Sequence, residues 1–400
     1  MHVKRHMPGL LASALGLLIF HVTCIAQVRT ANDASRSTAL ALEQQGHISD
    51  AETAWQAIAR SDPADAEAPA HLGLLEARQG HYDEAIPLYR KALALNPAMP
   101  GLRMNLGLAY YKSGDLRSAA TIFETLLGAN PKGSPEALRL VTLLGLARYG
   151  LGDYARAVPY LKEAAAADPQ NLSLRMLLAH SCLWSKQYQC VLDTYHEILT
   201  INPESAEADM LAGEADDELK NDAGALEQFQ AAIKANPALP NVHFGYGYLL
   251  WKDLKFEESK REFEAELTNA PDHPLALAYL GDTELRLDHA DVAAPCLEHA
   301  IRILPSIAVA HLDLGIIYDQ QGRKDDALRE LKAAEKLNPS DPAVHWRLGR
   351  FYQSVGQKAE ARSELEQTQK LQNATAQSLR EQMHQVESQP QAGGHGSAPK

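Results

Sequence analysis

A proline recurs along this 400-residue chain at an almost constant interval. Successive members of the series are 34 residues apart, except for one interval of 38 residues. The prolines are Pro63, Pro97, Pro131, Pro169, Pro203, Pro237, Pro271, Pro305 and Pro339. A fixed period of this length is the signature of one supersecondary unit repeated along the chain. We therefore expect a linear array of repeats and not two or three independent globular domains.

Other positions keep the same phase when the proline is numbered 32 within each repeat. Position 8 is glycine or alanine, position 20 is nearly always small, and position 24 is always large and apolar. In the third repeat these residues are Gly107, Ala119 and Phe123. A glycine inside a helix costs about 1 kcal/mol relative to alanine. Because this glycine recurs in phase, it indicates the close approach of two helices.

The same numbering predicts where the helices begin and end. We expect helix A over positions 1–14 and helix B over about positions 16–29. Glycine at position 15 favours a left-handed turn between them, and the proline at position 32 ends helix B. In the one longer interval, Ser134-Pro135-Glu136 has the pattern of a helix start. The four extra residues predict one additional turn of helix A there.

These constraints at positions 8, 20, 24 and 32 resemble the tetratricopeptide repeat, which is a pair of antiparallel helices. The resemblance covers about residues 32–375, or ten repeats. It implies an all-α, right-handed superhelical α-solenoid whose A helices line a concave groove. We assign the array to residues 27–375. Residues 376–387, with Leu379, Met383 and Val386 on one face, are interpreted as a C-terminal capping helix and residues 388–400 as a disordered tail.

The first 26 residues have the three-part pattern of a secretory signal peptide. Lys4 and Arg5 precede an uncharged apolar run from Pro8 to Ala26, and cleavage is expected after Ala26. The alternative is an uncleaved membrane anchor, because the run almost reaches the length that spans a bilayer. We expect an exported protein, either periplasmic or extracellular, with membrane contact only through this segment.

The net charge limits the class of partner, and the cysteines bear on the redox state of the compartment. The formal net charge of −13 makes nucleic acid an improbable ligand. Beyond the apolar run, the cysteines are Cys182, Cys190 and Cys296, without a CxxC pair. The sequence favours unpaired thiols on helices, while a Cys182–Cys190 disulfide is the alternative in an oxidising compartment.

The chain lacks the sequence motifs that carry common catalytic chemistry. It contains no GxSxG, HExxH, GxxxxGK[ST] or strand-linked GxGxxG motif. We therefore expect no enzymatic activity, no metal site and no cofactor. The acidic stretch Glu214, Asp216, Asp217 and Glu218 is interpreted as a charged helix face or as an attractor for a basic partner.

By resemblance to the family, positions 2, 5, 9, 12 and 13 face the groove. Phe244, Tyr248 and Trp251 lie on one helical face and are the strongest binding candidates, unless they serve only to pack against the neighbouring A helix. The further candidates are Met104, Tyr111, Tyr149, Met176, His180, Trp184, Glu214, Asp217, Glu218, Asp282, Arg286, Asp319, Trp346, Arg347 and Arg350.

These residues predict the chemical class of the partner but do not identify it. Some family members bind C-terminal carboxylates through lysine at position 5 and asparagine at position 9, and this chain lacks that pair. We expect a non-catalytic scaffold that binds a protein or peptide carrying apolar and basic residues. The alternatives are a self-associating structural array and an auxiliary subunit of an envelope enzyme.

Overall fold

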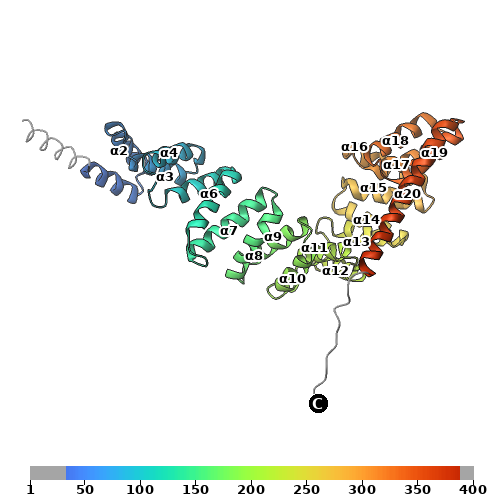
Figure 1. Ribbon diagram of the computed structural model, residues 1–400, viewed down its shortest axis with the longest axis horizontal. Coiled ribbons are helices and arrows are strands. Elements are labelled where there is room, and N and C mark those ends of the chain that lie inside the picture. Colours follow the sequence, from blue (N-terminus) through green and yellow to red (C-terminus); the bar gives the residue numbers. More distant parts are fainter. Residues whose placement is uncertain (1–32, 388–400) are drawn as a thin grey trace, which may run out of the picture. The chain divides into compact units, whose positions relative to one another are not determined.

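The computed structural model describes residues 33–387, which form helices joined by short turns without any β-strand (Figure 1). Residues 33–44 are helical, and the expected signal segment and tail lie outside the described residues. The later helices are α2 Ile48–Ser61, α3 Glu67–Arg78, α4 Tyr82–Leu95, α5 Leu102–Ser113, α6 Leu116–Ala129, α7 Pro135–Gly150, α8 Tyr154–Ala167, α9 Leu172–Trp184, α10 Tyr188–Leu199, α11 Ala206–Glu218, α12 Asp222–Ala235, α13 Val242–Lys252, α14 Phe256–Asn269, α15 Pro274–Arg286, α16 Ala290–Ile303, α17 Ala308–Gln320, α18 Lys324–Leu337, α19 Pro342–Ser354 and α20 Lys358–Glu387.

The chain divides into two compact units, an N-terminal unit (residues 1–187) and a C-terminal unit (residues 188–400). In each unit, helices A and B of one repeat pack as a pair, as α5 does with α6 and α17 with α18. Each pair also stacks on the next, for example through α14 and α15. The chain is therefore an all-α repeat solenoid, as the proline period predicts.

The glycine at position 8 accommodates the large residue at position 24. A Cβ atom on Gly107 would lie 2.7 Å from Phe123 Cε1, and one on Gly213 would lie 2.8 Å from Phe229 Cδ2. Such separations are well inside van der Waals contact, so neither site admits a side chain without displacing the ring. The prediction of close helix packing is confirmed. Position 20 contributes its backbone oxygen to this contact, since the Ala225 oxygen lies 3.4 Å from the place that a Cβ on Gly213 would take.

The turn between helices A and B is left-handed in every repeat. The six repeats with glycine at position 15 all have positive φ there, as expected. The other four place Lys186, Lys220, Leu254 and Asp288 at this position, with φ between 59° and 65°. Packing of the two helices therefore imposes the left-handed conformation even where the residue disfavours it.

The longer interval follows the sequence, and the array ends in one long helix. Helix α7 has 16 residues, and the Ser134 hydroxyl accepts a hydrogen bond from the Ala137 amide at its start. Helix α20 runs without a break over 30 residues, so residues 376–387 continue helix B of the tenth repeat. The side chains of Leu379, Met383 and Val386 lie outside what the structure describes, and their capping role stays a prediction.

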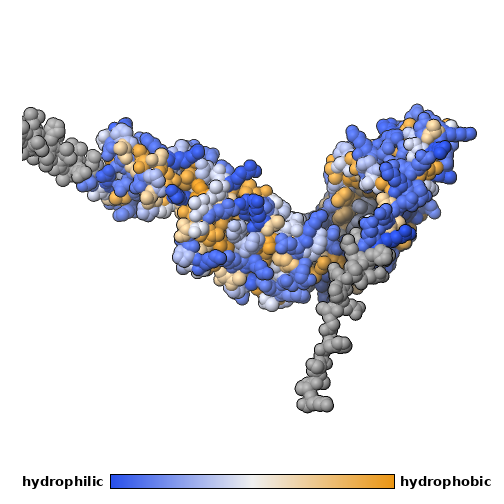
Figure 2. Space-filling view, viewed as in Figure 1, coloured by the Kyte–Doolittle hydropathy of each residue, from blue (hydrophilic) through white to orange (hydrophobic). Residues whose placement is uncertain are grey.

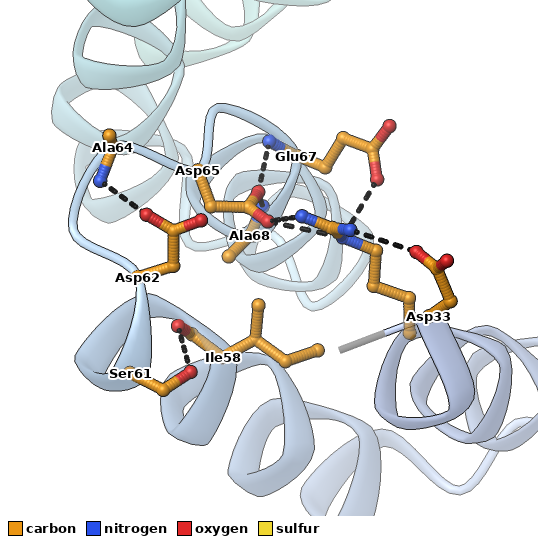
Figure 3. Close-up of polar contacts among 9 residues, drawn as sticks. Asp33, Ile58, Ser61, Asp62, Ala64, Asp65, Glu67 and Ala68 are labelled. Atoms are coloured by element: carbon orange, nitrogen blue, oxygen red, sulfur yellow. Dashed lines mark hydrogen bonds and ion pairs between the residues drawn. The ribbon is translucent and has the colours of Figure 1, made fainter. Parts of the chain in front are cut away.

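A buried carboxylate connects residues 33–44 to the start of α3. Asp65 Oδ1 accepts hydrogen bonds from the amides of Glu67 (2.7 Å) and Ala68 (2.9 Å), as Figure 3 shows. Its Oδ2 accepts a hydrogen bond from Arg36 Nε at 3.1 Å. The Arg36 guanidinium and the two amides hold the pKa of Asp65 below its usual value, although burial opposes that shift.

Most large apolar side chains lie between the helices, and on the face in Figure 2 the apolar residues form small groups among polar ones. No helix within residues 33–387 is long and apolar enough to cross a membrane. Cys182 and Cys190 are both disulfide-bonded, contrary to our expectation, and Cys296 is a free thiol.

Candidate functional site

The A helices of the C-terminal unit form one continuous surface. Consecutive helices α11, α13, α15, α17 and α19 contact one another directly. Side chains from neighbouring repeats therefore meet although they are about one repeat apart in the sequence. This surface holds most of the polar and aromatic contacts described below, and we call it the A-helix surface.

Four aromatic rings from two of these helices form an aromatic cluster. Phe244, Tyr248 and Trp251 occupy successive turns of α13, with ring centroids 6.4 Å and 5.8 Å apart. Tyr279 of α15 packs edge-on against all three, at 5.1 to 6.0 Å. All four side chains are half-buried. The three predicted rings thus lie together and also pack against the neighbouring A helix.

Tyr279 was not predicted from the sequence, because it occupies position 6, outside the positions assigned to the groove. Burial raises the pKa of its hydroxyl to about 12, so the ring stays neutral at physiological pH. Tyr279 is recognisable in the sequence as a large ring at position 6 of the eighth repeat, directly after the repeat that carries Phe244, Tyr248 and Trp251.

A buried carboxylate connects the aromatic cluster to the last repeats. Trp251 Nε1 donates a hydrogen bond to Asp282, and Arg286 Nε donates to Asp282 Oδ1 at 3.3 Å. Asp282 is only 1% exposed and also shares a hydrogen bond with Asp313 of α17. Two neighbouring carboxyl groups in a buried site do not both ionise readily. Burial and the charge of Asp282 raise the pKa of Asp313 well above its usual value.

The acidic stretch of α11 is partly neutralised within the unit. Asp217 forms an ion pair with Lys252, and Glu218 accepts a hydrogen bond from the Tyr188 hydroxyl at 3.2 Å. Burial raises the pKa of Glu214 to about 7. The stretch is therefore less negative than its sequence suggests, which weakens its predicted attraction for a basic partner.

Candidates in the N-terminal unit form two separate groups. Met104 lines a cavity of about 320 Å³, and Met104 and Tyr111 both pack against the core of α6 and α7. Trp184 is 48% exposed and lies beside Tyr149 (5.9 Å), His180 (5.0 Å) and Tyr154 (4.6 Å), measured between ring centroids. Tyr154 was not predicted from the sequence. Met176 is half-buried on the same helix as Trp184.

A histidine–glutamate pair recurs at positions 4 and 23 in three repeats. His243, His311 and His345 each place Nδ1 2.7 Å from a glutamate oxygen, on Glu262, Glu330 and Glu364 respectively. In the last two repeats, Nε2 also contacts the carbonyl of the preceding position-32 proline. These pairs connect helix A to helix B and to the preceding repeat. They were not predicted, although their shared phase was visible in the sequence.

His345 also belongs to the group most similar to a metal site among the described residues, together with Glu335 and Glu364. Both of its ring nitrogens already have partners, since Nδ1 contacts Glu364 and Nε2 contacts the Pro339 carbonyl at 2.9 Å. Lys332 lies 2.8 Å from Glu335 and 3.3 Å from Glu364. The group is thus explained as an ion-pair network without a metal.

The stability of the tenth repeat is expected to fall as the pH rises above about 6.5. Burial opposes the charged imidazole, but hydrogen bonds to Glu364 and to the Pro339 carbonyl raise the pKa of His345. A raised pKa stabilises the fold below the unfolded value, and that stabilisation is lost as the pH passes the folded value. Hydrogen exchange of α19 amides should show a loss of about 1 kcal/mol between about pH 6 and 8. In His345→Gln this pH dependence should disappear, and its persistence would contradict the assignment.

Comparison with known proteins agrees with the repeat architecture. Two family models described as tetratricopeptide repeat match more than half of the chain, one over residues 76–144, 149–211 and 320–383 and the other over residues 37–100. The chain belongs to the tetratricopeptide repeat family. Proteins of this family are typically non-catalytic scaffolds for protein interactions. No curated protein matches the sequence.

Solved structures match parts of this chain at low sequence identity. A tetratricopeptide repeat protein from Parabacteroides merdae ATCC 43184 is 19% identical, with a TM-score of 0.48, and the match covers 67% of this chain and 97% of that chain. YrrB, described as having an unusual peptide-binding site, is 18% identical over 47% of this chain and 97% of its own, with a TM-score of 0.38. A chain of the APC/C hetero-tetramer Cut9–Hcn1 is 13% identical over 85% of this chain and 87% of its own, with a TM-score of 0.44.

Proposed function

We propose that this tetratricopeptide repeat protein binds a protein or peptide partner through the A-helix surface of its C-terminal unit. The observation that carries the proposal is the aromatic cluster, in which Phe244, Tyr248, Trp251 and Tyr279 form one half-buried surface. Rings held in place by one another lose little conformational freedom when a ligand covers them. An apolar segment of a partner, extended or helical, suits such a surface.

Basic residues on that partner are a weaker part of the proposal. Lys252 already pairs with Asp217, which leaves Glu214 and Glu218 as the nearest acidic groups of α11. Since Glu214 has a pKa of about 7, its charge is only partly present at neutral pH. The apolar contact with the aromatic cluster is therefore the main source of affinity.

We further propose that the protein is exported and acts in the periplasm or outside the cell. The apolar N-terminal run with its expected cleavage after Ala26 supports export. The disulfide bonds of Cys182 and Cys190 suit an oxidising compartment. Cell fractionation, with N-terminal sequencing of the recovered protein, tests both parts of this proposal.

The binding surface is tested by affinity capture from the cell envelope with three versions of the full-length protein. The wild type is compared with Phe244→Ala/Tyr248→Ala, which leaves the hydrogen bond of Trp251 intact. The control is Val292→Ala on helix B α16, because Val292 is 46% exposed and lies outside the A helices. We expect the double variant to lose its specific partners by about tenfold or more, about 1.4 kcal/mol in binding free energy. Undiminished capture by a double variant of normal helix content would refute the proposal.

A further inference from the structure

One histidine connects the starts of the two helices that carry the aromatic cluster. His273 lies directly before α15, and its Nδ1 accepts a hydrogen bond from the Ala276 amide at 2.9 Å. Its Nε2 lies 2.8 Å from Oδ1 of Asn241, the residue directly before α13. Because a backbone amide can only donate, Nδ1 must lack a hydrogen, and Nε2 must carry the hydrogen that bonds to Asn241. The ring is therefore neutral in this arrangement.

These two hydrogen bonds fix the orientation of the ring and place it beside Phe244. The ring centroids of His273 and Phe244 are 5.2 Å apart. Phe244 also contacts Tyr279 of α15, at 6.0 Å between centroids. The amides of Asn241 and Phe244 both donate to Glu266 of α14, at 2.9 Å and 3.1 Å. His273 thus connects the start of α13, which Glu266 holds in place, to the first turn of α15.

The position of His273, 34 in the repeat numbering, also caps the following helix A in other repeats. The residues there that accept a hydrogen bond from an amide at the start of that helix are Asp65, Asn171, Ser205 and Asp341. Aspartate, asparagine and serine are preferred helix caps, and none of them changes charge near neutral pH. Histidine changes charge between about pH 5 and 8. The eighth repeat therefore begins with a titratable cap.

Protonation of His273 is incompatible with this arrangement. The added hydrogen lies on Nδ1 and faces the Ala276 amide, so the hydrogen bond between them is lost. The start of α15 is also the positive end of the helix dipole, which disfavours a cation there. With one of its two bonds lost, the ring can turn away from Phe244. His345 is the opposite case, since both of its ring nitrogens face acceptors.

The charged groups around this junction already have partners. Both oxygens of Glu266 accept hydrogen bonds from backbone amides. On α13, His243 pairs with Glu262 of α14 at 2.7 Å. Asp272, just before the ring, pairs with His299 of α16 at 3.1 Å. The hydrogen bond that protonation removes is therefore not replaced by a contact that the folded chain already provides.

We propose that His273 is a positioning residue of the aromatic cluster, whose neutral ring holds Phe244 against Tyr279 and whose protonation releases that contact. The inference rests on the proposed function of the A-helix surface and adds its regulation by pH. The aromatic cluster is assembled at about pH 7.5 and loosened at about pH 5.5. A partner bound through the cluster is therefore released in acid.

NMR of the full-length protein without a partner tests the proposal at about pH 7.5 and about pH 5.5. The ring nitrogen signals of His273 should show Nδ1 without a hydrogen at the higher pH and with one at the lower pH. At the lower pH, the Ala276 amide should exchange about fivefold faster in the wild type than in His273→Asn. At the higher pH the two rates should agree. The nuclear Overhauser effect between Phe244 and Tyr279 should weaken in acid in the wild type.

His273→Asn is the deciding variant, because asparagine caps a helix at the same position in Asn171 and does not titrate. Its Ala276 amide should be protected equally at both pH values, whereas His273→Ala should lack this protection at both. The control His299→Gln removes a neighbouring histidine without removing an acceptor for an amide, and it should behave as the wild type. Since Glu214 and Asp313 also have raised pKa values, the difference between the wild type and His273→Asn carries the assignment.

Three NMR results would overturn the proposal. The first is a hydrogen on Nδ1 of His273 at about pH 7.5. The second is an equal effect of acid on the wild type and on His273→Asn. The third is a contact between Phe244 and Tyr279 that persists undiminished in acid in the wild type.

Affinity capture from the cell envelope with the wild type and His273→Asn tests the release of a partner. The wild type should retain about fivefold less of its specific partners at about pH 5.5 than at about pH 7.5, whereas His273→Asn should retain similar amounts at both. Equal retention by the wild type would contradict release in acid. Because the NMR measurements need no partner, failure of capture at the higher pH counts against the proposed function, and an unchanged ring contact counts against this inference.

Discussion

Replacing Phe229 by alanine is expected to destabilise α11, α12 and α13 by about 3–5 kcal/mol. The ring is 3% exposed and lies between two glycines, Gly213 of its own repeat and Gly245 of the next. Its loss leaves a cavity that backbone glycines cannot fill. Repeat arrays do not unfold in one step, so the effect is best measured as local free energies from hydrogen exchange in the full-length protein.

The effect of Gly213→Ala should change sign with the residue at position 229. In the wild type, the new Cβ would lie 2.8 Å from the Phe229 ring, and overpacking of this kind costs about 1–3 kcal/mol. In Phe229→Ala, the next neighbour is the Ala225 oxygen at 3.4 Å, an ordinary contact. Alanine should then stabilise the helix by up to about 1 kcal/mol.

Gly128→Ala provides the control, since no atom lies within 4 Å of its Cβ position. It should be neutral or stabilising regardless of residue 229. Equal costs of Gly213→Ala in the two backgrounds would show that the glycine is required for some reason other than the ring.

Asp282→Ala should destabilise the C-terminal unit by about 3 kcal/mol, because it removes the acceptor for Trp251, Arg286 and Asp313 together. Asp313→Asn should instead stabilise the unit at neutral pH. Because the pKa of Asp313 is raised in the folded protein, the free-energy cost of this buried carboxyl group grows as the pH rises, and asparagine avoids that cost.

The pH dependence of this pair has a defined sign. Since the folded pKa of Asp313 is raised, its favourable contribution is complete below about pH 4 and is lost as the pH rises through the folded value. Thermal unfolding between about pH 4 and 8 should therefore show a decline in the wild type that is smaller in Asp313→Asn. A steeper decline in the variant would mean that Asp313 is ionised and paired.

The fold followed from the sequence because each constraint recurs in phase. Gly107 indicates close helix packing only because the nine equivalent positions in the other repeats are also glycine or alanine. The proline series sets the register for all of them. The helix boundaries, the extra turn of α7 and the contact of position 8 with position 24 were therefore predictable.

The site was only partly predictable, because its contacts join different repeats. The sequence indicated Phe244, Tyr248 and Trp251, which share one helix, but not Tyr279. In the sequence alone, Asp282 is a single charged residue at a groove position, since nothing in the sequence shows that Asp313 lies beside it.

Pairing between repeats also changes the electrostatics of the surface. Asp217 looked available to a ligand, yet Lys252, 35 residues later, neutralises it. Periodicity fixes which positions share a face, whereas the identity of each pair depends on rotamers that periodicity does not determine.

The most direct test of the central claim is site-specific photo-crosslinking in intact cells, with benzoylphenylalanine at position 248 in one version and at position 292 in another. If the partner binds on the A-helix surface, position 248 should give a discrete adduct and position 292 should give none. An adduct from position 292 with none from position 248 would contradict the claim and would place the binding surface on the B helices.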